Sequence, residues 1–276
     1  MNYHFFDYKY NIENFQSDLF SVPHIIFIVL SFLLVPTISI LLRKINHKKI
    51  DKFIKIFSIA WVVLEIVKIT WESYWDISTG RGFNTGGILP LYTCSLFIYT
   101  MLFAAWSKGK AKDYSLAFIT TISLISGAIG IVQCNGLNYY PFWTFGGFYS
   151  MFFHLSMFAT GVFLLFTGYK KLEWKDMIKA WVPMLILSVI ASPVNYEYGA
   201  DYMQIYEGSG IPFFSTLSGI LADHGLRFVF TIIMLITYIP LTLVIIGPAK
   251  LVYFINDKRK NKLPNKKPEE KSNISQ

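Results

Sequence analysis

Four side chains with chemical capability lie at similar depth within apolar stretches of the sequence. Cys94 lies in ILPLYTCSLF, His154 in SMFFHLSMF, and Glu65 and Lys68 in an earlier apolar stretch. A thiol is a weak nucleophile until it loses its proton, and an apposed imidazole can take that proton and later return it. Glu65 and Lys68 are three residues apart, a spacing that lets them form an ion pair on one helix face. These residues predict a nucleophile and base, supported by an ion pair.

Each of these side chains also has a purely structural interpretation. A single Cys in an apolar helix commonly acts as a small hydrophobic residue, and a buried His is often satisfied by a nearby hydroxyl or carbonyl. Glu65 and Lys68 can simply neutralise each other. Cys134, in the stretch 133–147, offers Cys94 a disulfide partner if that side of the molecule is oxidising, although the depth of Cys94 argues against the bond. The residues alone leave these alternatives open.

The elements that must position these groups follow from the composition of the 276-residue chain. Hydrophobic residues make up 54% and charged residues 15% of it, whereas about a quarter of a globular protein is charged. So few charges cannot cover a soluble protein with this much apolar side chain. The aromatic content of 18% excludes intrinsic disorder. The composition therefore predicts an integral membrane protein.

Seven segments are long and apolar enough to cross a hydrocarbon layer about 30 Å thick. They occur at 22–42, 53–72, 88–106, 114–132, 148–168, 177–194 and 226–247. The fourth is diluted by Thr, Ser and Gly, which is typical of helix-to-helix packing, and Pro183 and Pro193 interrupt the sixth. We expect an all-α bundle of seven transmembrane helices, with Cys94, His154, Glu65 and Lys68 in its outer layer.

The distribution of basic residues predicts the orientation of this bundle. The connections at 43–52, 108–112 and 170–175 and the stretch 250–271 hold most of the 25 Lys and Arg residues, and only Lys9 and Arg81 fall in the opposite connections. Basic residues favour the cytoplasmic side, so the N-terminus is expected outside and the C-terminus in the cytoplasm. The net charge of +8 then indicates contact with anionic lipid at the cytoplasmic face, without nucleic acid as a partner.

Three regions are expected along the chain. Residues 1–21 lack a basic region and a cleavage site typical of a signal peptide, and are interpreted as an extracytoplasmic N-terminal segment. Residues 22–255 form the seven-helix membrane domain. Residues 256–276 are polar and rich in Lys, which predicts a disordered basic cytoplasmic tail.

The motifs around these residues resemble those of the transmembrane protein 164 family and its bacterial YwaF-type members. The matching stretches are EIVKITW from Glu65, LPLYTC ending at Cys94, FFHLSMF around His154, and VNYEYGADYM from Val194 to Met203. The resemblance implies a seven-helix membrane acyltransferase that acts on phospholipids, with Cys94 as nucleophile and His154 as base. Tyr92 and Ser95 replace a His and an Asp that are common in bacterial relatives, and Asp201 replaces an Asn. The replacements at Tyr92 and Ser95 imply either a different activation of the thiol or a weaker activity.

Our leading hypothesis is therefore an integral membrane acyltransferase that forms an acyl-cysteine intermediate on phospholipid or lysophospholipid acyl chains. Lys68 or a backbone amide near Pro90 is expected to stabilise the oxyanion, and Glu65 is expected to hold Lys68 or to orient the imidazole of His154. Asn195 and Tyr202 are candidate supporting or substrate-binding residues. We expect a bacterial plasma membrane location and no cofactor.

The alternative hypothesis is a non-enzymatic membrane transporter or small-molecule binding protein that uses Glu65 and Lys68 as an intramembrane site. A metal hydrolase is disfavoured because His154 has no second ligand at suitable spacing on its helix, so no metal site is predicted. The donor, the acceptor, the choice between transfer and hydrolysis, and the oligomeric state are left open by the sequence.

Overall fold

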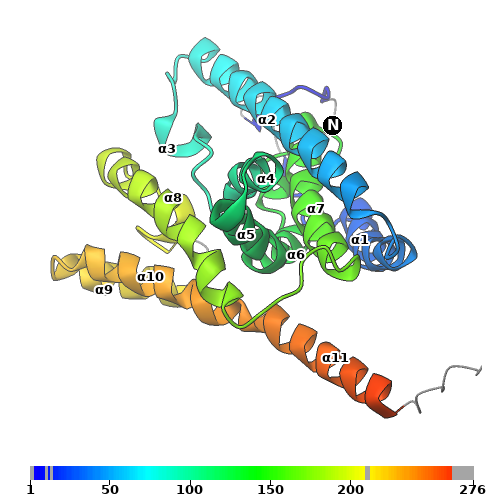
Figure 1. Ribbon diagram of the computed structural model, residues 1–276. Coiled ribbons are helices and arrows are strands. Elements are labelled where there is room, and N and C mark those ends of the chain that lie inside the picture. The colour runs from blue at the N-terminus through cyan, green and yellow to red at the C-terminus, as the bar shows by residue number, and fades with distance from the viewer. Residues whose placement is uncertain (1–2, 10–11, 13–14, 209–211, 263–276) are drawn as a thin grey trace, which may run out of the picture.

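The computed structural model describes residues 3–9, 12, 15–208 and 212–262, and within them the chain forms helices and no strand. Figure 1 shows the arrangement of the elements. The first half of the chain forms α1 (Val22–Leu41), α2 (His47–Ser78), α3 (Thr85–Ile88), α4 (Leu96–Trp106), α5 (Gly109–Phe118), η2 (Ile119–Ser123), α6 (Leu124–Val132) and η3 (Asn135–Asn138). The second half forms α7 (Phe145–Phe166), α8 (Asp176–Tyr198), η4 (Tyr202–Gln204), α9 (Pro212–Asp223), α10 (Arg227–Leu241) and α11 (Leu243–Lys262).

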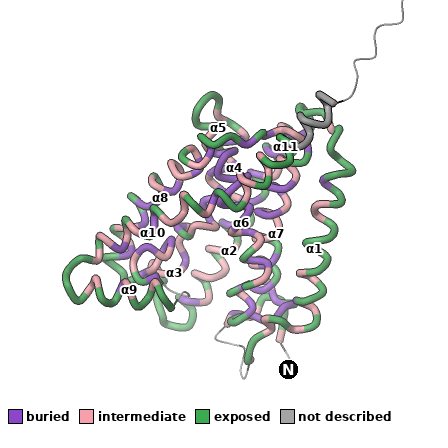
Figure 2. The backbone as a smooth tube through the Cα atoms, turned by 90° about the horizontal axis from the view of Figure 1, so that it is seen from below, coloured by how far each residue is buried: buried purple, intermediate pink, exposed green. Residues whose placement is uncertain are grey.

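The centre of the bundle is one long helix made of α5, the π-helical turn η2, and α6. This helix contacts α4, α7 and α8, and it is more deeply buried than the helices around it (Figure 2). Two of its buried hydroxyls are satisfied locally, because Thr120 donates to the carbonyl of Leu116 and Thr121 to that of Ala117, both at 2.6 Å. Hydroxyls bonded in this way can lie in an apolar interior without a free polar group. The buried hydroxyl of Ser123 has no hydrogen-bond partner among the described residues.

Small residues in α6 allow α7 to approach closely. A Cβ atom added to Gly127 would lie 2.6 Å from the backbone nitrogen of Phe158, and one added to Gly130 would lie 2.0 Å from Cδ2 of His154. Neither space admits a larger side chain. The packing role predicted for small residues in the segment 114–132 is therefore confirmed by its contacts with α7.

Five helical stretches are long and apolar enough to cross a membrane, by length and composition, within the described residues. They are Val22–Leu41, Gly109–Asn138, Phe145–Phe166, Asp176–Tyr198 and Arg227–Phe254. Pro183 and Pro193 lie within α8 without ending it. The chain is thus an all-helical, multi-pass membrane protein.

The two remaining predicted spans look different in the structure. The segment 53–72 lies inside the 32-residue α2. This helix is not one of the five apolar stretches, because it carries charged residues. The segment 88–106 is not one helix: α3 ends at Ile88, residues 89–95 are irregular, and α4 has only 11 residues. Pro90 explains the interruption, because proline lacks an N–H and disfavours helix in the residue before it. Seven spans and the orientation of the termini remain predictions.

The basic connections come together at one end of the bundle, which we call the basic end. Lys112 of α5 pairs with Asp51 of α2 at 3.0 Å. Lys170, before α8, pairs with Asp113 of α5 at 2.7 Å and with Asp176 of α8 at 3.0 Å. These ion pairs join α2, α5 and α8 at the same end, as the charge pattern predicts.

The other end of the bundle, which we call the opposite end, is covered by aromatic residues and by the N-terminal segment. Tyr8 is almost fully buried and contacts the rings of Trp71, Trp75 and Tyr140. The indole nitrogen of Trp71 donates to the carbonyl of Phe6 at 3.0 Å. The N-terminal segment is therefore attached to the end of α2 that carries the candidate residues.

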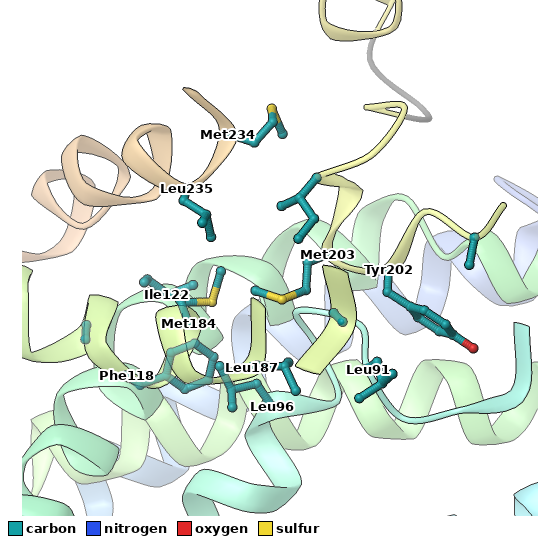
Figure 3. Close-up of a cluster of buried hydrophobic side chains, with 14 of the residues drawn as sticks. Leu91, Leu96, Phe118, Ile122, Met184, Leu187, Tyr202, Met203, Met234 and Leu235 are labelled. Atoms are coloured by element: carbon teal, nitrogen blue, oxygen red, sulfur yellow. The ribbon is translucent and has the colours of Figure 1, made fainter. Parts of the chain in front are cut away.

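A second layer of helices, α8 to α10, lies along one side of the bundle (Figure 1). Its apolar core contains residues from α4, α5, α8, η4 and α10, including Leu96, Phe118, Met184 and Met234. Figure 3 shows this cluster, with Tyr202 at its edge and the hydroxyl directed away from it.

Helix α11 continues to Lys262, so the backbone is helical in the first part of the segment 256–276, where the sequence predicts disorder. The remainder of that predicted tail, residues 263–276, lies outside the described residues.

Candidate functional site

Cys94 lies in the irregular segment between α3 and α4, directly before the amino end of α4. Its carbonyl accepts the N–H of Phe97 at 3.0 Å, which starts the first turn. The segment is held by the Tyr99 hydroxyl, which donates to the carbonyl of Pro90 at 3.1 Å. The amino end of a helix carries partial positive charge and favours a nearby anion. The fold thus places a partly buried thiol beside the amino end of α4.

Helix α2 presents a row of charged side chains near the thiol, which together with Tyr149 we call the polar cluster. The cluster consists of Glu65, Lys68, Glu72 and Tyr149. Nζ of Lys68 lies 3.8 Å from Oε1 of Glu65 and 3.2 Å from Oε2 of Glu72. The Tyr149 hydroxyl of α7 donates a short hydrogen bond to Oε2 of Glu65. Glu65 and Lys68 therefore pair as their spacing predicts.

The carboxylates of this cluster outnumber its ammonium group. Oε1 of Glu65 and Oε2 of Glu72 are buried and have no hydrogen-bond donor in suitable geometry among the described residues, although both lie within ion-pair distance of Lys68. Lys9, in the N-terminal segment, adds a second positive charge that acts on Glu72. Uncompensated charge away from water is costly and is typical of functional groups in membrane proteins.

Cys94 belongs to the electrostatic environment of this cluster. The thiol interacts with Lys68 and Glu65 and with the backbone N–H groups of Cys94 and Ser95. Tyr149 also interacts with Cys94. Three of the four residues predicted in one layer, Cys94, Glu65 and Lys68, are therefore brought together.

His154 has different neighbours. Its Nδ1 lies 2.8 Å from the carbonyl of Ser150, one turn earlier in α7, and its ring packs on Gly130 of α6. A carbonyl only accepts, so we assign the proton to Nδ1, which leaves the lone pair on Nε2. Within the described part of the chain, no hydrogen bond joins His154 to Cys94. The directly bonded pair expected from the sequence is absent from this conformation.

Helix geometry explains why Tyr149 and His154 have different partners. Five residues in a helix of 3.6 residues per turn rotate a side chain by about 140° from its starting direction. Tyr149 faces α2, where it meets Glu65 and Trp61. His154 consequently faces α6, even though the two residues share one helix and similar depth.

The candidate supporting residues Asn195 and Tyr202 hold the segment that contains Cys94. Asn195 is buried, and its amide donates to the carbonyl of Tyr202 at 3.0 Å and accepts the Tyr202 N–H at 2.8 Å. The Tyr202 hydroxyl donates to the carbonyl of Thr85 at 2.7 Å and accepts the N–H of Leu89 at 3.0 Å. These two residues thereby fix where the irregular segment begins.

Most of this chain matches a protein-family model. The model described as the TMEM164 family matches residues 19–238. The chain belongs to the TMEM164 family. No curated protein and no solved structure matches it. The matched part of this TMEM164 family protein includes the whole polar cluster together with Cys94 and His154.

Three positions noted as departures from the family motif have distinct roles here. Tyr92 is partly exposed and its ring meets Tyr202 edge-on at 4.8 Å. Ser95 is buried and precedes α4 without capping it through its side chain. Oδ1 of Asp201 accepts the N–H groups of Tyr206 and Glu207, both at 2.9 Å. The oxygen of an Asn side chain accepts in the same way, so either residue suits this turn.

Both cysteines of this TMEM164 protein are free. Cys134 is buried and donates to the Ser150 hydroxyl at 3.3 Å. The disulfide between Cys94 and Cys134, left open by the sequence, is absent. Cys94 is therefore available for chemistry.

Two members of the polar cluster, Glu72 and Tyr149, are missing from the sequence-based prediction. The membership of Glu72 can be predicted from the sequence, because it follows Lys68 by four residues and Glu65 by seven, which places all three on one helix face. The membership of Tyr149 cannot, since only the packing of α7 against α2 shows that its hydroxyl reaches Glu65.

An apolar cavity of about 480 Å³ lies between α4, α5 and α8. It begins at Leu91 and Leu96, on either side of Cys94 in the chain, and continues to Phe103 and Tyr114 toward the basic end. On α8 it is lined from Val182 to Ile190, a distance of about 12 Å at 1.5 Å per residue. Its volume is in the range of about 300–1,000 Å³ that is usual for small-molecule sites.

Proposed function

We propose that this protein is an integral membrane acyltransferase that transfers phospholipid or lysophospholipid acyl chains through an acyl-Cys94 intermediate. The observation that carries the proposal is the position of Cys94, at the amino end of α4 and within electrostatic reach of Lys68. A cation and a helix amino end both stabilise a thiolate, which is the reactive form of cysteine. Membership of the TMEM164 family fits a multi-pass membrane setting for this chemistry.

The proposed reaction has two balanced steps. In the first, Sγ of Cys94 bonds to the acyl carbonyl carbon, the ester C–O bond breaks, and the thiol proton passes to the departing lysolipid oxygen. In the second, an acceptor hydroxyl attacks the thioester, the C–S bond breaks, and the hydroxyl proton returns to sulfur. Lys68 or a backbone N–H near Pro90 stabilises the oxyanion in both steps.

His154 is proposed to carry these protons. The lone pair on Nε2 is the basic atom, and Nδ1 is held by the carbonyl of Ser150. Catalytic hydrogen bonds often form only in the substrate complex. The imidazole has to leave its contact with Gly130 to meet Sγ, so this role requires a rotation of the His154 side chain.

The apolar cavity supports an acyl substrate. Leu91 and Leu96 line one end of it and flank Cys94 in sequence, while its other walls come from α5 and α8. An acyl chain in this cavity contacts apolar side chains along its length, so it can leave the lipid without exposing its apolar surface to water.

The proposal is tested by looking for the covalent intermediate. The purified full-length protein is incubated with a phospholipid that carries an isotope-labelled acyl chain, and thioester adducts are mapped by mass spectrometry before and after hydroxylamine treatment. We expect a hydroxylamine-labile adduct on Cys94, which Cys94→Ala abolishes. Cys134→Ala is the matched control, because it removes the other free thiol and is expected to leave the adduct intact.

The role of His154 is tested separately. His154→Gln keeps a side chain that can bond to the Ser150 carbonyl, but it removes the basic nitrogen. We expect adduct formation to fall by about 100-fold or more, which is typical for loss of a general base. Absence of an adduct in the wild-type protein, or an equal yield in Cys94→Ala, contradicts the enzyme proposal.

The second candidate function is a non-enzymatic transporter or small-molecule binding protein. The uncompensated charge of Glu65, Lys68 and Glu72 favours it, because a solute or ion of suitable charge can complete such a cluster. This function predicts that Glu65→Gln abolishes activity in cells while Cys94→Ala retains it. The acyltransferase predicts the reverse requirement for Cys94.

The proposed setting is the plasma membrane of a bacterium, as for the YwaF-type members, with the opposite end outside. Phospholipids are the proposed substrates, and the basic end is proposed to contact anionic cytoplasmic lipid.

A further inference from the structure

The indole nitrogen of Trp61 is a buried donor that the reaction proposed above does not use. Trp61 is 4% exposed, and its Nε1 donates no hydrogen bond within the described residues. Oε1 of Glu65, one turn later in α2, is a buried acceptor that receives no hydrogen bond from them, although it lies 3.8 Å from Nζ of Lys68. Buried polar groups are normally bonded to protein or to ordered water. A partner for both atoms has to accept one hydrogen bond and donate another.

Trp61 and Glu65 are close enough for one small molecule to bond to both. Residues four apart in a helix have Cβ atoms about 5–6 Å apart. Tyr149 of α7 contacts both side chains, because its hydroxyl bonds to Oε2 of Glu65 and its ring meets the Trp61 ring edge-on at 5.9 Å. A buried water typically makes about three hydrogen bonds. A water that accepts from Nε1 of Trp61 and donates to Oε1 of Glu65 satisfies both atoms.

This position is beside the irregular residues 89–95, which we call the reaction segment. Cys94 packs against the hydrophobic cluster that contains Trp61, and its thiol interacts with Glu65. Both contacts come from α2. The apolar cavity proposed for the acyl chain is lined instead by α4, α5 and α8. A water held by α2 and an acyl chain in the cavity therefore reach Cys94 from different helices.

A row of polar groups connects this position with the opposite end of the bundle. Lys68 and Glu72 follow Glu65 along α2. The Tyr140 hydroxyl interacts with both Glu72 and Asp76, and Asp76 lines a polar pocket of about 380 Å³ at the ends of α2 and α8. Oδ2 of Asp76 is another buried acceptor that receives no hydrogen bond from the described residues. Polar side chains within a membrane bundle typically line water-filled routes, so this row fits a route for water from the pocket.

We propose that a water molecule held by Trp61 and Glu65 hydrolyses acyl-Cys94, so that the protein also releases free fatty acid. This activity rests on the proposed acyl-cysteine intermediate, whereas the water site does not. The water oxygen bonds to the thioester carbonyl carbon, Glu65 takes one proton from the water, and the C–S bond breaks. The proton then passes from Glu65 to the sulfur of Cys94. The products are a fatty acid and the free thiol.

Hydrolysis and transfer to an alcohol then use different bases. His154 faces α6 and has to rotate to reach Cys94, whereas Glu65 already interacts with the thiol. Loss of the Glu65 carboxylate is therefore expected to lower the ratio of released fatty acid to transferred acyl chain. Loss of the His154 imidazole is expected to raise it.

The main experiment follows the fate of an isolated adduct. Full-length protein is acylated with an isotope-labelled phospholipid, freed of phospholipid and lysolipid, and incubated in water enriched in oxygen-18 without an acceptor alcohol. Mass spectrometry measures the adduct on Cys94 and the released fatty acid. We expect the adduct to decay and the fatty acid to gain one oxygen-18 atom. An adduct that persists, or a fatty acid that lacks this isotope, overturns the proposal.

Two variants assign the water to its site. Glu65→Gln removes the base and is expected to lengthen the lifetime of the adduct by about 100-fold or more. Trp61→Phe keeps an aromatic ring against Tyr149 but removes the donor, and is expected to lengthen the lifetime by about tenfold. Trp181→Phe is the matched control, because its indole nitrogen donates to the carbonyl of Leu235 at 2.8 Å, away from the polar cluster.

The control variant is expected to leave the lifetime unchanged. If Glu65→Gln does not fold, the comparison of Trp61→Phe with Trp181→Phe decides the result. Equal lifetimes in the wild type and in the variants at Trp61 and Glu65 overturn the proposal.

The water itself is tested without the reaction, in full-length Cys94→Ala protein. Hydroxyl radicals that X-ray radiolysis generates from bound water oxidise the side chains beside it. We expect oxidation of Trp61, although it is buried, and none of Met157, which is fully buried in the same hydrophobic cluster. Absence of oxidation at Trp61, or equal oxidation of the two residues, overturns the water site.

The outcomes separate this proposal from the acyltransferase. If the Cys94 adduct forms and passes its chain to an alcohol but releases no fatty acid in water, the acyltransferase stands and the hydrolysis proposal fails. If no adduct forms in the wild-type protein, the acyltransferase fails and hydrolysis fails with it, while oxidation of Trp61 still supports the water site.

Discussion

The two ends of the bundle differ in how completely their buried carboxylates are paired. At the basic end, Asp176 is fully buried, and both Lys170 and Lys179 pair with it, at 3.0 Å and 3.2 Å. Toward the opposite end, Glu72 and Asp76 each have a buried oxygen that receives no hydrogen bond from the described residues, although the Glu72 oxygen lies 3.2 Å from Nζ of Lys68. A charge with complete partners stabilises the fold, whereas a charge without them costs stability and persists where function requires it. This difference fits a stabilising role for the first region and supports the binding or catalytic role proposed for the second.

The largest expected loss of stability follows Asp176→Asn. The substitution leaves Lys170 and Lys179 with Asp113 alone and weakens the hydrogen bond to the N–H of Glu173. Removing one partner from a buried ion pair costs about 3–5 kcal/mol. Unfolding by sodium dodecyl sulfate in mixed micelles measures this loss. Glu173→Gln is the control, since its side chain is exposed; a loss in Asp176→Asn no larger than in that control breaks the comparison.

A smaller loss is expected for Asn195→Ala, which tests whether the opposite end also contains a rigid part. The side chain makes two hydrogen bonds to the backbone of Tyr202, directly before Met203 and Gln204, whose φ angles of 60° and 57° are left-handed. Such backbone persists only where surrounding contacts hold it. We expect a loss of about 1–3 kcal/mol from the buried groups left unpaired.

The same micelle assay measures this loss, and adduct formation on Cys94 reports whether the reaction segment moves. Tyr202→Phe keeps the ring but removes the bridge between Thr85 and Leu89, so its effect on the adduct is expected to exceed its effect on stability. Tyr196→Phe is the matched control, because Tyr196 is exposed. Equal behaviour of the two phenylalanine variants contradicts a positioning role for Tyr202.

The sequence predicts only part of this difference between the two ends of the bundle. Apolar length and the positions of Lys and Arg predict helices and a basic end, because both depend on local composition. The pairing of Glu65 with Lys68 follows from helical spacing. The interruption before Cys94 is harder to predict, since Pro90 lies inside a run that is apolar enough to count as one span.

The partner of each buried side chain depends on helix rotation, which composition does not reveal. His154 and Tyr149 both belong to α7, and only its packing on α6 and α2 decides that Tyr149 reaches Glu65 while His154 packs on Gly130. Arg227 shows the same limit. Its spacing from Asp223 suggests an ordinary ion pair, but the helix breaks between them, and Arg227 instead lies over the Tyr206 ring at 4.1 Å.

A modest pH-dependent effect is expected from Asp51 at the basic end. Burial disfavours its charge, but hydrogen bonds from Tyr169 and Lys112 outweigh burial and hold the pKa of Asp51 below its ordinary value of 3.8. A lowered pKa stabilises the fold above the unfolded value, and this contribution is lost as the pH falls through the folded value. Asp51 is partly exposed, so the contribution is about 0.2–1 kcal/mol.

The measurement compares Asp51→Asn with the wild type from neutral pH to below pH 3.8 in the same micelles. The variant is expected to be less stable at neutral pH, and the difference is expected to vanish in acid as the wild-type carboxylate becomes protonated. A difference that stays constant across this range shows that Asp51 acts through packing and not through its charge.

The smallest effect on stability is expected for Glu72→Gln, and it is the sharpest test of the comparison. Lys68 keeps Glu65 as a partner after this change, and the cluster loses the charge that it does not compensate. We therefore expect stability within about 1 kcal/mol of the wild type, in contrast to the loss of about 3–5 kcal/mol at Asp176. Adduct formation on Cys94 is nevertheless expected to change, because Glu72 sets the field in which Lys68 acts on the thiol. If Glu72→Gln unfolds as readily as Asp176→Asn, its carboxylate holds the fold together, and the division between the two ends fails.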